Sequence, residues 1–263
     1  MHYGLVRSYA DYCKRKKKLI EEGTLDLSDL DWIYPTLLLP LDEILANEEI
    51  VYEEPRSRSV CDYISWMRSA ASAIPTDSYI PIMKSKMFSD TDLQHMYNLV
   101  GTGRLHENTL KEIMGELVTN IQEHSKCSNS IFMVQKYTRK GFLEMAFFDN
   151  GRTIAGSFRE CGFYKTDLED LDYIKLAISG NSTKGVADRG HGLPNTINIT
   201  NAGLLGDILI VSGKGAFYIE GSDREPKEST HYKLNELQSL GGTLIALRIP
   251  LPIKDIDVYD YIK

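Results

Sequence analysis

The strongest constraint on the fold is a change of hydrophobic period that follows Ser125. Before this residue, apolar side chains recur at helical spacing through the segment 107–125. After it, the runs SIFMVQKY (130–137) and GFLEMAFF (141–148) are rich in β-branched and aromatic residues, and the turn Thr138–Lys140 joins them. We therefore predict a long helix that leads directly into an antiparallel hairpin.

Similar patterns predict the remaining elements of the C-terminal part. The run GDILIVSGKGAFYIEG (206–221) indicates a second hairpin, and GGTLIALRIP (241–250) indicates a terminal strand. A further strand at 79–83 and helices at 90–100 and 168–179 are also expected.

The N-terminal part alternates between helix and strand. Apolar spacing, Pro35 and Gly23 indicate helices over 6–22, 35–47 and 59–73, with short strands at 25–27 and 50–52. This alternation is typical of a small α/β unit. The segment IPTD (74–77) is typical of a linker. We therefore predict two domains, over residues 1–76 and 77–263.

Composition excludes several classes of protein. With 263 residues, 42% hydrophobic and 25% charged, the chain is long enough for a real core and is not of a disordered type. A net charge of −7 argues against nucleic acid as the main partner. The four cysteines form no C-x-x-C pair, which predicts reduced thiols in a cytoplasmic protein. No apolar run is long enough to span a membrane, so no membrane partner is expected.

A basic run, KRKKK (14–18), lies on the first predicted helix. It could contact phosphates or an acidic partner. Because Glu21 and Glu22 follow at once, we interpret it as a solvated helix face.

The segment MGELVTNIQEHS (114–125) carries the main candidate chemistry. Glu116, Asn120 and His124 are spaced four residues apart, so a helix would place them on one face. An amide oxygen can bind Mg²⁺, and a carboxylate one turn away can orient or deprotonate a nucleophile. The alternative is an ordinary solvated helix face, and His124 fits helix packing equally well.

Two glycine-containing motifs follow. Asp149 and Gly151 stand at the end of the second predicted strand, where a carboxylate can meet a ligand and glycine permits close backbone approach. A tight turn is the alternative, but the residues that follow do not alternate as a return strand would. In RGHGL (189–193), Gly190 and Gly192 precede a helix with Pro194 in its first turn, a pattern that suits an anion or simply caps the helix.

Taken in order, ELVTNIQEH, DNG, RGHGL and GGT resemble the motifs of the GHKL superfamily of ATP-binding domains, over about residues 79–250. The resemblance implies an α/β fold of two layers, in which helices cover one face of a mixed sheet. It also implies ATP and Mg²⁺ as ligands. The spacing of Glu116, Asn120 and His124 is most similar to that of the serine kinases that regulate sigma factors.

The same resemblance assigns roles to individual residues. Glu116 would be the general base, and Asn120 would hold Mg²⁺. Asp149 would accept a hydrogen bond from the adenine amino group. Gly151 would pass beneath the base, and Thr243 would bind near it. The phosphates would be contacted by residues before and within the RGHGL motif: Lys184, Arg189, Gly190, His191, Gly192 and Leu193.

One departure accompanies this resemblance. Many members carry D-x-G-x-G, whereas this chain has Thr153 at the second glycine, which affects the path of a lid expected over about 152–189.

Residues 26–47 resemble the strand, turn and helix of STAS domains, with Thr36 at the place of the phosphorylated serine. Tyr34 and Leu37 depart from that pattern, where the family has aspartate and glycine.

These motifs lead to alternative functions. The first is an Mg²⁺-dependent enzyme that hydrolyses ATP or transfers its γ-phosphate to a protein. The second is a regulatory module that uses ATP only as a conformational ligand and holds a protein partner. A DNA clamp driven by ATP is disfavoured by the acidic charge. The sequence leaves open which protein is the partner and whether the chain forms a homodimer.

Overall fold

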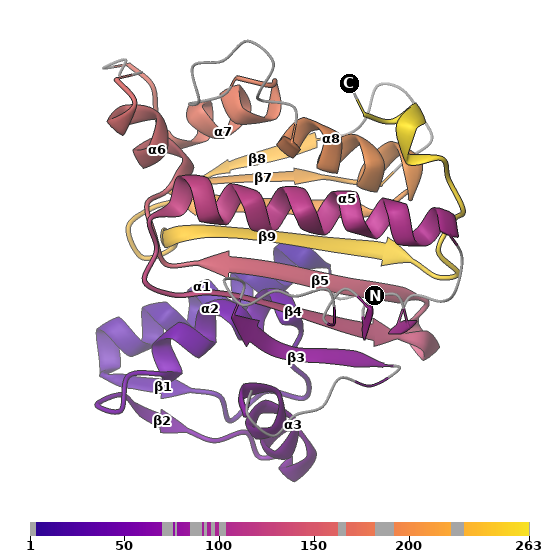
Figure 1. The fold of residues 1–263 in the computed structure, drawn as a ribbon. Coiled ribbons are helices and arrows are strands. Elements are labelled where there is room, and N and C mark those ends of the chain that lie inside the picture. Colours follow the sequence, from indigo (N-terminus) through magenta and orange to yellow (C-terminus); the bar gives the residue numbers. More distant parts are fainter. Residues whose placement is uncertain are drawn as a thin grey trace.

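A seven-stranded sheet forms the centre of the molecule (Figure 1). The structure is a computed structural model that describes residues 4–69, 76, 78–84, 91, 94–95, 98–99, 104–162, 167–181, 192–221 and 229–262. The strand order is β3-β4-β5-β9-β6-β7-β8. The strands are β3 (Tyr79–Lys84), β4 (Ser130–Tyr137), β5 (Phe142–Asp149), β6 (Asp207–Gly213), β7 (Gly215–Ile219), β8 (Ser229–Lys233) and β9 (Leu240–Pro250).

Both predicted hairpins are confirmed. Strand β4 pairs with β5 through a 3₁₀ turn at Thr138–Lys140, and β6 pairs with β7. The prediction of a mixed sheet is wrong, because every described pairing within the seven-stranded sheet is antiparallel. The hairpins make their own strands antiparallel, and β9 lies between β5 and β6 and runs antiparallel to both.

One face of the sheet is covered by helices from the C-terminal part. The long helix α5 (Arg104–Asn120) continues into a π-helical turn, Ile121–Ser125, and packs beside α8. The other elements near this face are α6 (Ile154–Glu160), α7 (Asp170–Ile178), α8 (Gly192–Asn198), a second π turn (Ile199–Gly203) and a 3₁₀ turn (Val258–Asp260).

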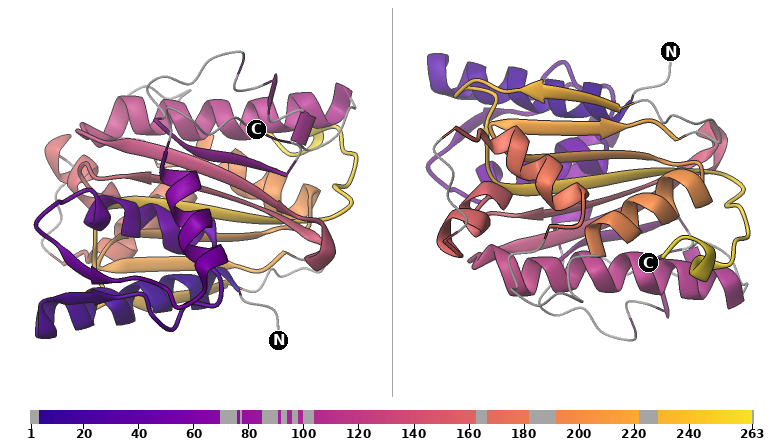
Figure 2. Two further views of the ribbon diagram at one scale, coloured as in Figure 1. Left: turned by 90° about the horizontal axis from the view of Figure 1, so that it is seen from below. Right: turned by 90° about the horizontal axis from the view of Figure 1, so that it is seen from above.

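The second face is covered by the N-terminal residues, so the prediction of helices on one face only is wrong. Figure 2 shows the sheet between α5 and α8 on one side and α1 on the other. The N-terminal helices share one buried apolar cluster with this face of the sheet. We call these N-terminal elements the N-terminal layer: α1 (Leu5–Glu22), β1 (Thr24–Asp26), α2 (Pro35–Leu45), β2 (Val51–Glu53) and α3 (Arg58–Arg68).

Alternation along the central strands divides their side chains between the two faces. In β4, Phe132 belongs to the cluster under α5, and its neighbour Met133 belongs to the cluster under the N-terminal layer. In β5, Phe147 and Ala146 divide in the same way, and the rings of Phe132 and Phe147 stack with centroids 5.8 Å apart. Both strands are therefore apolar on both faces because both faces are buried.

The predicted N-terminal elements are confirmed within two or three residues, except that α3 ends at Arg68, five residues before the predicted end at 73. Strands β1 and β2 form a separate parallel pair. The proposed boundary at residue 76 lies in a stretch, 70–77, of which only residue 76 is described. The side chain of Thr36 is fully buried, and its hydroxyl donates a hydrogen bond to Glu144 Oε1 at 2.7 Å. In this arrangement the hydroxyl is inaccessible to a kinase.

Candidate functional site

Helix α5 brings two of the predicted residues to the start of α8. Glu116 and Asn120 are both half-buried. A Cβ atom placed on Gly192 would lie 2.0 Å from Glu116 Oε2 and 3.7 Å from Asn120 Nδ2. Any side chain at position 192 would therefore displace the Glu116 carboxylate. The absence of a side chain there lets the α8 backbone approach the carboxylate and the carboxamide together.

His124 falls in the π turn Ile121–Ser125, and therefore outside the regular α-helix that carries Glu116 and Asn120. Burial and the nearby Arg152 lower the pKa of His124 from its ordinary value. Both effects favour the neutral imidazole.

Asp149 ends β5 and is almost fully buried. In the sheet it lies opposite Ser130 of β4 and Thr243 of β9. Its Oδ1 accepts a hydrogen bond from Gly151 N at 3.0 Å. Burial raises the pKa of the Asp149 carboxyl to about 7, although the Gly151 N–H works in the opposite direction. A carboxylate poised in this way at a strand end is typical of a functional site.

The turn after Asp149 contacts the end of the α5 segment. A Cβ atom on Gly151 would lie 2.1 Å from the carbonyl oxygen of Ser125, so only glycine fits there. Arg152 N donates to the same carbonyl at 2.7 Å, and Arg152 Nε donates to His124 O at 2.6 Å. The Asp149–Gly151 turn thus lies against Ser125, only five residues after Asn120 in the same helical segment.

Thr243 belongs to a small hydroxyl cluster beside this turn. Its Oγ1 lies 3.0 Å from Ser212 Oγ, and Ser212 Oγ accepts a hydrogen bond from Ile154 N at 2.8 Å. Ser212 was not among the predicted residues. The signal for it was weak: a polar residue at the end of the apolar run ILIV.

The predicted lid over 152–189 is only partly described. Its described residues form helices α6 and α7, which share a buried cluster that includes Phe158 and the fully buried Tyr173. Thr153, the departure from the D-x-G-x-G pattern, caps α6 by accepting a hydrogen bond from Gly156 N at 3.0 Å. This part of the predicted lid is therefore packed helix, not a loose flap.

The other phosphate-contact candidates are placed only in part. Leu193 is half-buried and packs against the apolar cluster under α5. Four predicted contacts lie outside the described residues: Lys184, Arg189, Gly190 and His191.

The donor set fits a metal that is shared with a ligand. Within the described ranges, no three His, Cys, Asp or Glu side chains cluster so as to hold a metal ion by themselves. An amide oxygen on Asn120 with Glu116 one turn away is a pair that suits Mg²⁺ only if phosphate oxygens and water complete the coordination.

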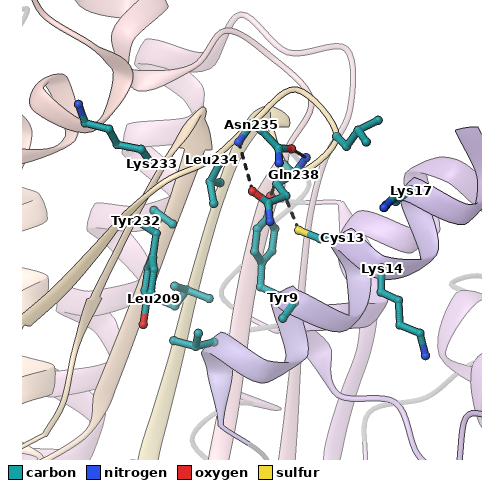
Figure 3. A pocket seen from close by; sticks show the side chains of 14 residues that line it. Tyr9, Cys13, Lys14, Lys17, Leu209, Tyr232, Lys233, Leu234, Asn235 and Gln238 are labelled. Carbon is teal, nitrogen blue, oxygen red and sulfur yellow. Dashed lines mark hydrogen bonds between the residues drawn. The ribbon is translucent and has the colours of Figure 1, made fainter.

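A pocket of about 590 Å³ lies elsewhere, between α1 and strands β6, β7 and β8 (Figure 3). Tyr9 and Cys13 donate hydrogen bonds to the carbonyl oxygen of Gln238, at 2.7 and 3.6 Å. Burial raises the pKa of the Cys13 thiol to about 11, which makes it a poor nucleophile. None of the predicted site residues lines this pocket.

The raised pKa of Asp149 predicts a pH-dependent stability. Between about pH 4 and 7 the folded protein retains a proton that the unfolded chain has released, so the free energy of unfolding falls as pH rises through this window. Asp149→Asn removes this titration and keeps an acceptor for Gly151 N. We expect the variant to gain stability relative to wild type as pH rises, by at most about 4 kcal/mol.

Urea unfolding of both proteins at pH 4.5 and pH 8 measures this change, because all other titrations are common to the two and cancel. A difference in stability that is the same at both pH values would contradict the account of Asp149.

Comparison with known proteins assigns no family. No family model matches this chain, and no curated protein is significantly similar to it. Among the residues that the structure describes, no helix combines the length and the apolar character needed to cross a bilayer.

Proposed function

We propose that the protein binds Mg·ATP at the junction of α5, α8 and the end of β5, and that it hydrolyses ATP or transfers the γ-phosphate to a protein. The observation that carries this proposal is that one helical segment, α5 with its π turn, contacts both the start of α8 and the turn after β5. Its Glu116 and Asn120 face Gly192, and its Ser125 carbonyl lies against the Asp149–Gly151 turn. This segment is itself the first motif, two of the other three motifs contact it, and the last, at Thr243, pairs with Asp149.

In this proposal each residue has a distinct task. The Asp149 carboxylate accepts a hydrogen bond from the adenine amino group, and Thr243 and Gly151 lie beside the base. Asn120 contributes its amide oxygen to Mg²⁺, which neutralises charge on the phosphates. Glu116, beside Gly192, orients and deprotonates the attacking hydroxyl of water or of a protein side chain.

The group that attacks the γ-phosphate of ATP is either water or a protein hydroxyl. The second candidate is a module that binds ATP without turnover. It is favoured by the N-terminal layer, which packs directly on the sheet that bears Asp149 and could present the bound state to a partner.

Glu116→Gln tests the catalytic role. The substitution keeps the size of the side chain and removes the base, so we expect turnover to fall by about 100-fold or more, while affinity for Mg·ATP stays within about twofold. The measurement is release or transfer of label from γ-labelled ATP, with and without cell lysate.

Glu112→Gln, one turn earlier on α5 and also half-buried, is the matched control and should behave as wild type. Equal turnover by Glu116→Gln and wild type would contradict the role of Glu116. If wild type binds ATP but releases and transfers no label, the binding module is the correct alternative.

A further inference from the structure

Asn150 is the middle residue of the DNG turn, and its side chain makes hydrogen bonds to protein groups instead of to the proposed nucleotide. Its Oδ1 accepts hydrogen bonds from Asn129 N at 2.8 Å and from Ser128 Oγ at 3.2 Å. Its Nδ2 donates to Glu43 Oε1 at 2.7 Å. The orientation of the amide is therefore fixed, since the backbone N–H of Asn129 requires an oxygen.

Glu43 belongs to the last turn of α2, in the N-terminal layer. Its second oxygen, Oε2, accepts a hydrogen bond from Asn129 Nδ2 at 2.8 Å. The two carboxylate oxygens thus bind one amide from each of two loops, the loop before β4 and the turn after β5. Hydrogen bonds to an ionised carboxylate are about twice as strong as neutral ones.

Helix α2 is itself held to the sheet at its other end. At its first turn, the backbone N–H and the hydroxyl of Thr36 both donate to Glu144 Oε1 on β5, at 3.1 and 2.7 Å. Glu43 therefore projects from a helix that is anchored to the same strand whose end carries Asp149. A displacement of Glu43 would be transmitted through Asn150 to the residues on either side of it, Asp149 and Gly151.

We propose that Glu43 is a positioning residue for base recognition: through Asn150 it fixes the Asp149 carboxylate and thereby sets the preference for adenine over guanine. This inference rests on the proposed nucleotide site. It extends that proposal, because it makes the N-terminal layer a determinant of nucleotide selectivity.

Glu43→Met is the direct test. Methionine is similar in length to glutamate but has no side-chain oxygen, so the hydrogen bonds that Glu43 accepts from Asn150 Nδ2 and Asn129 Nδ2 are both lost. We expect the ratio of the Kd for GTP to that for ATP to fall about 10-fold, as is typical when a supporting hydrogen bond behind a ligand contact is lost. Affinity for inorganic tripolyphosphate, which has no base, should stay within about twofold.

Asp42→Asn is the matched control, because it removes an ion pair from the same helix, with Arg68 at 2.6 Å, and leaves the DNG turn untouched. It should retain the wild-type nucleotide preference. Asn129→Ala is a second test variant, which removes only the Glu43 Oε2 contact and should shift the ratio in the same direction by less.

The outcomes are separable. An unchanged ratio of the two Kd values in both Glu43→Met and Asn129→Ala would overturn the inference, and so would an equal change in Asp42→Asn. Loss of tripolyphosphate binding in parallel with ATP would indicate a general structural role and would also overturn it. Absence of ATP binding by wild type would instead refute the proposed function.

Discussion

Replacing Arg248 by methionine should lower the free energy of unfolding by about 3–5 kcal/mol, because it leaves a buried carboxylate without its cation. Glu144 is fully buried, and its Oε2 accepts hydrogen bonds from Arg248 Nη2 at 2.6 Å and Nε at 3.2 Å. The guanidinium carbon lies 4.3 Å from the centroid of the Phe142 ring. Methionine fills much of the same space, so the loss reports mainly on the charge.

Urea unfolding followed by circular dichroism measures the change. Arg58→Met is the matched control: it breaks the exposed Arg58–Asp62 pair, of 3.0 Å, in which the arginine side chain is 90% exposed. That loss should be at most about 1 kcal/mol. Similar losses in the two variants would show that Glu144 is not held as we describe.

Replacing Asn120 by alanine should weaken Mg·ATP binding by about 100-fold or more, since even the loss of groups that only support a metal ligand costs 10- to 100-fold. Asn120 is half-buried on the last turn of α5 and faces the backbone of Gly192. The same variant should bind ATP in the absence of Mg²⁺ with about the wild-type affinity, because only the metal contact is removed. Calorimetric titration with and without Mg²⁺ measures both quantities.

Thr119→Ala, at the adjacent exposed position of α5, is the control for effects on the helix itself. Its affinity for Mg·ATP should equal that of wild type. An unchanged Mg·ATP affinity in Asn120→Ala would remove the metal role of this residue.

Local patterns in the sequence predicted the elements well. The change of period after Ser125 located the hairpin β4–β5, and Pro35 and Gly23 located the start of α2 and the end of α1. These signals are local, because helix termini, turns and periodicity depend on residues within a few positions of one another. They also place Asp149 at the end of β5.

The second helical layer was missed, although the strands carry a signal for it. The run IFMV in β4 is apolar at successive positions, which is required only of a strand that is buried on both faces. The resemblance to the GHKL superfamily implies a sheet covered on one face, whereas these runs indicate a sheet covered on both.

Contacts between distant segments could not be predicted from local patterns. Glu43 and Asn150 are 107 residues apart in sequence, and Thr36 and Glu144 are 108 apart. Each residue alone is compatible with a solvated surface position. Only the packing of α2 on the sheet brings them together, which is why Glu43, Asn129 and Glu144 were absent from the predicted residues.

The most direct test of the nucleotide site is photolabelling with 8-azido-ATP in the presence of Mg²⁺, followed by peptide mapping. The account predicts label on peptides that contain Asn120, Asp149 or Thr243, and protection of these peptides by unlabelled ATP. Label confined to other peptides, such as those around the α1 pocket, or label that ATP does not compete away, would contradict it.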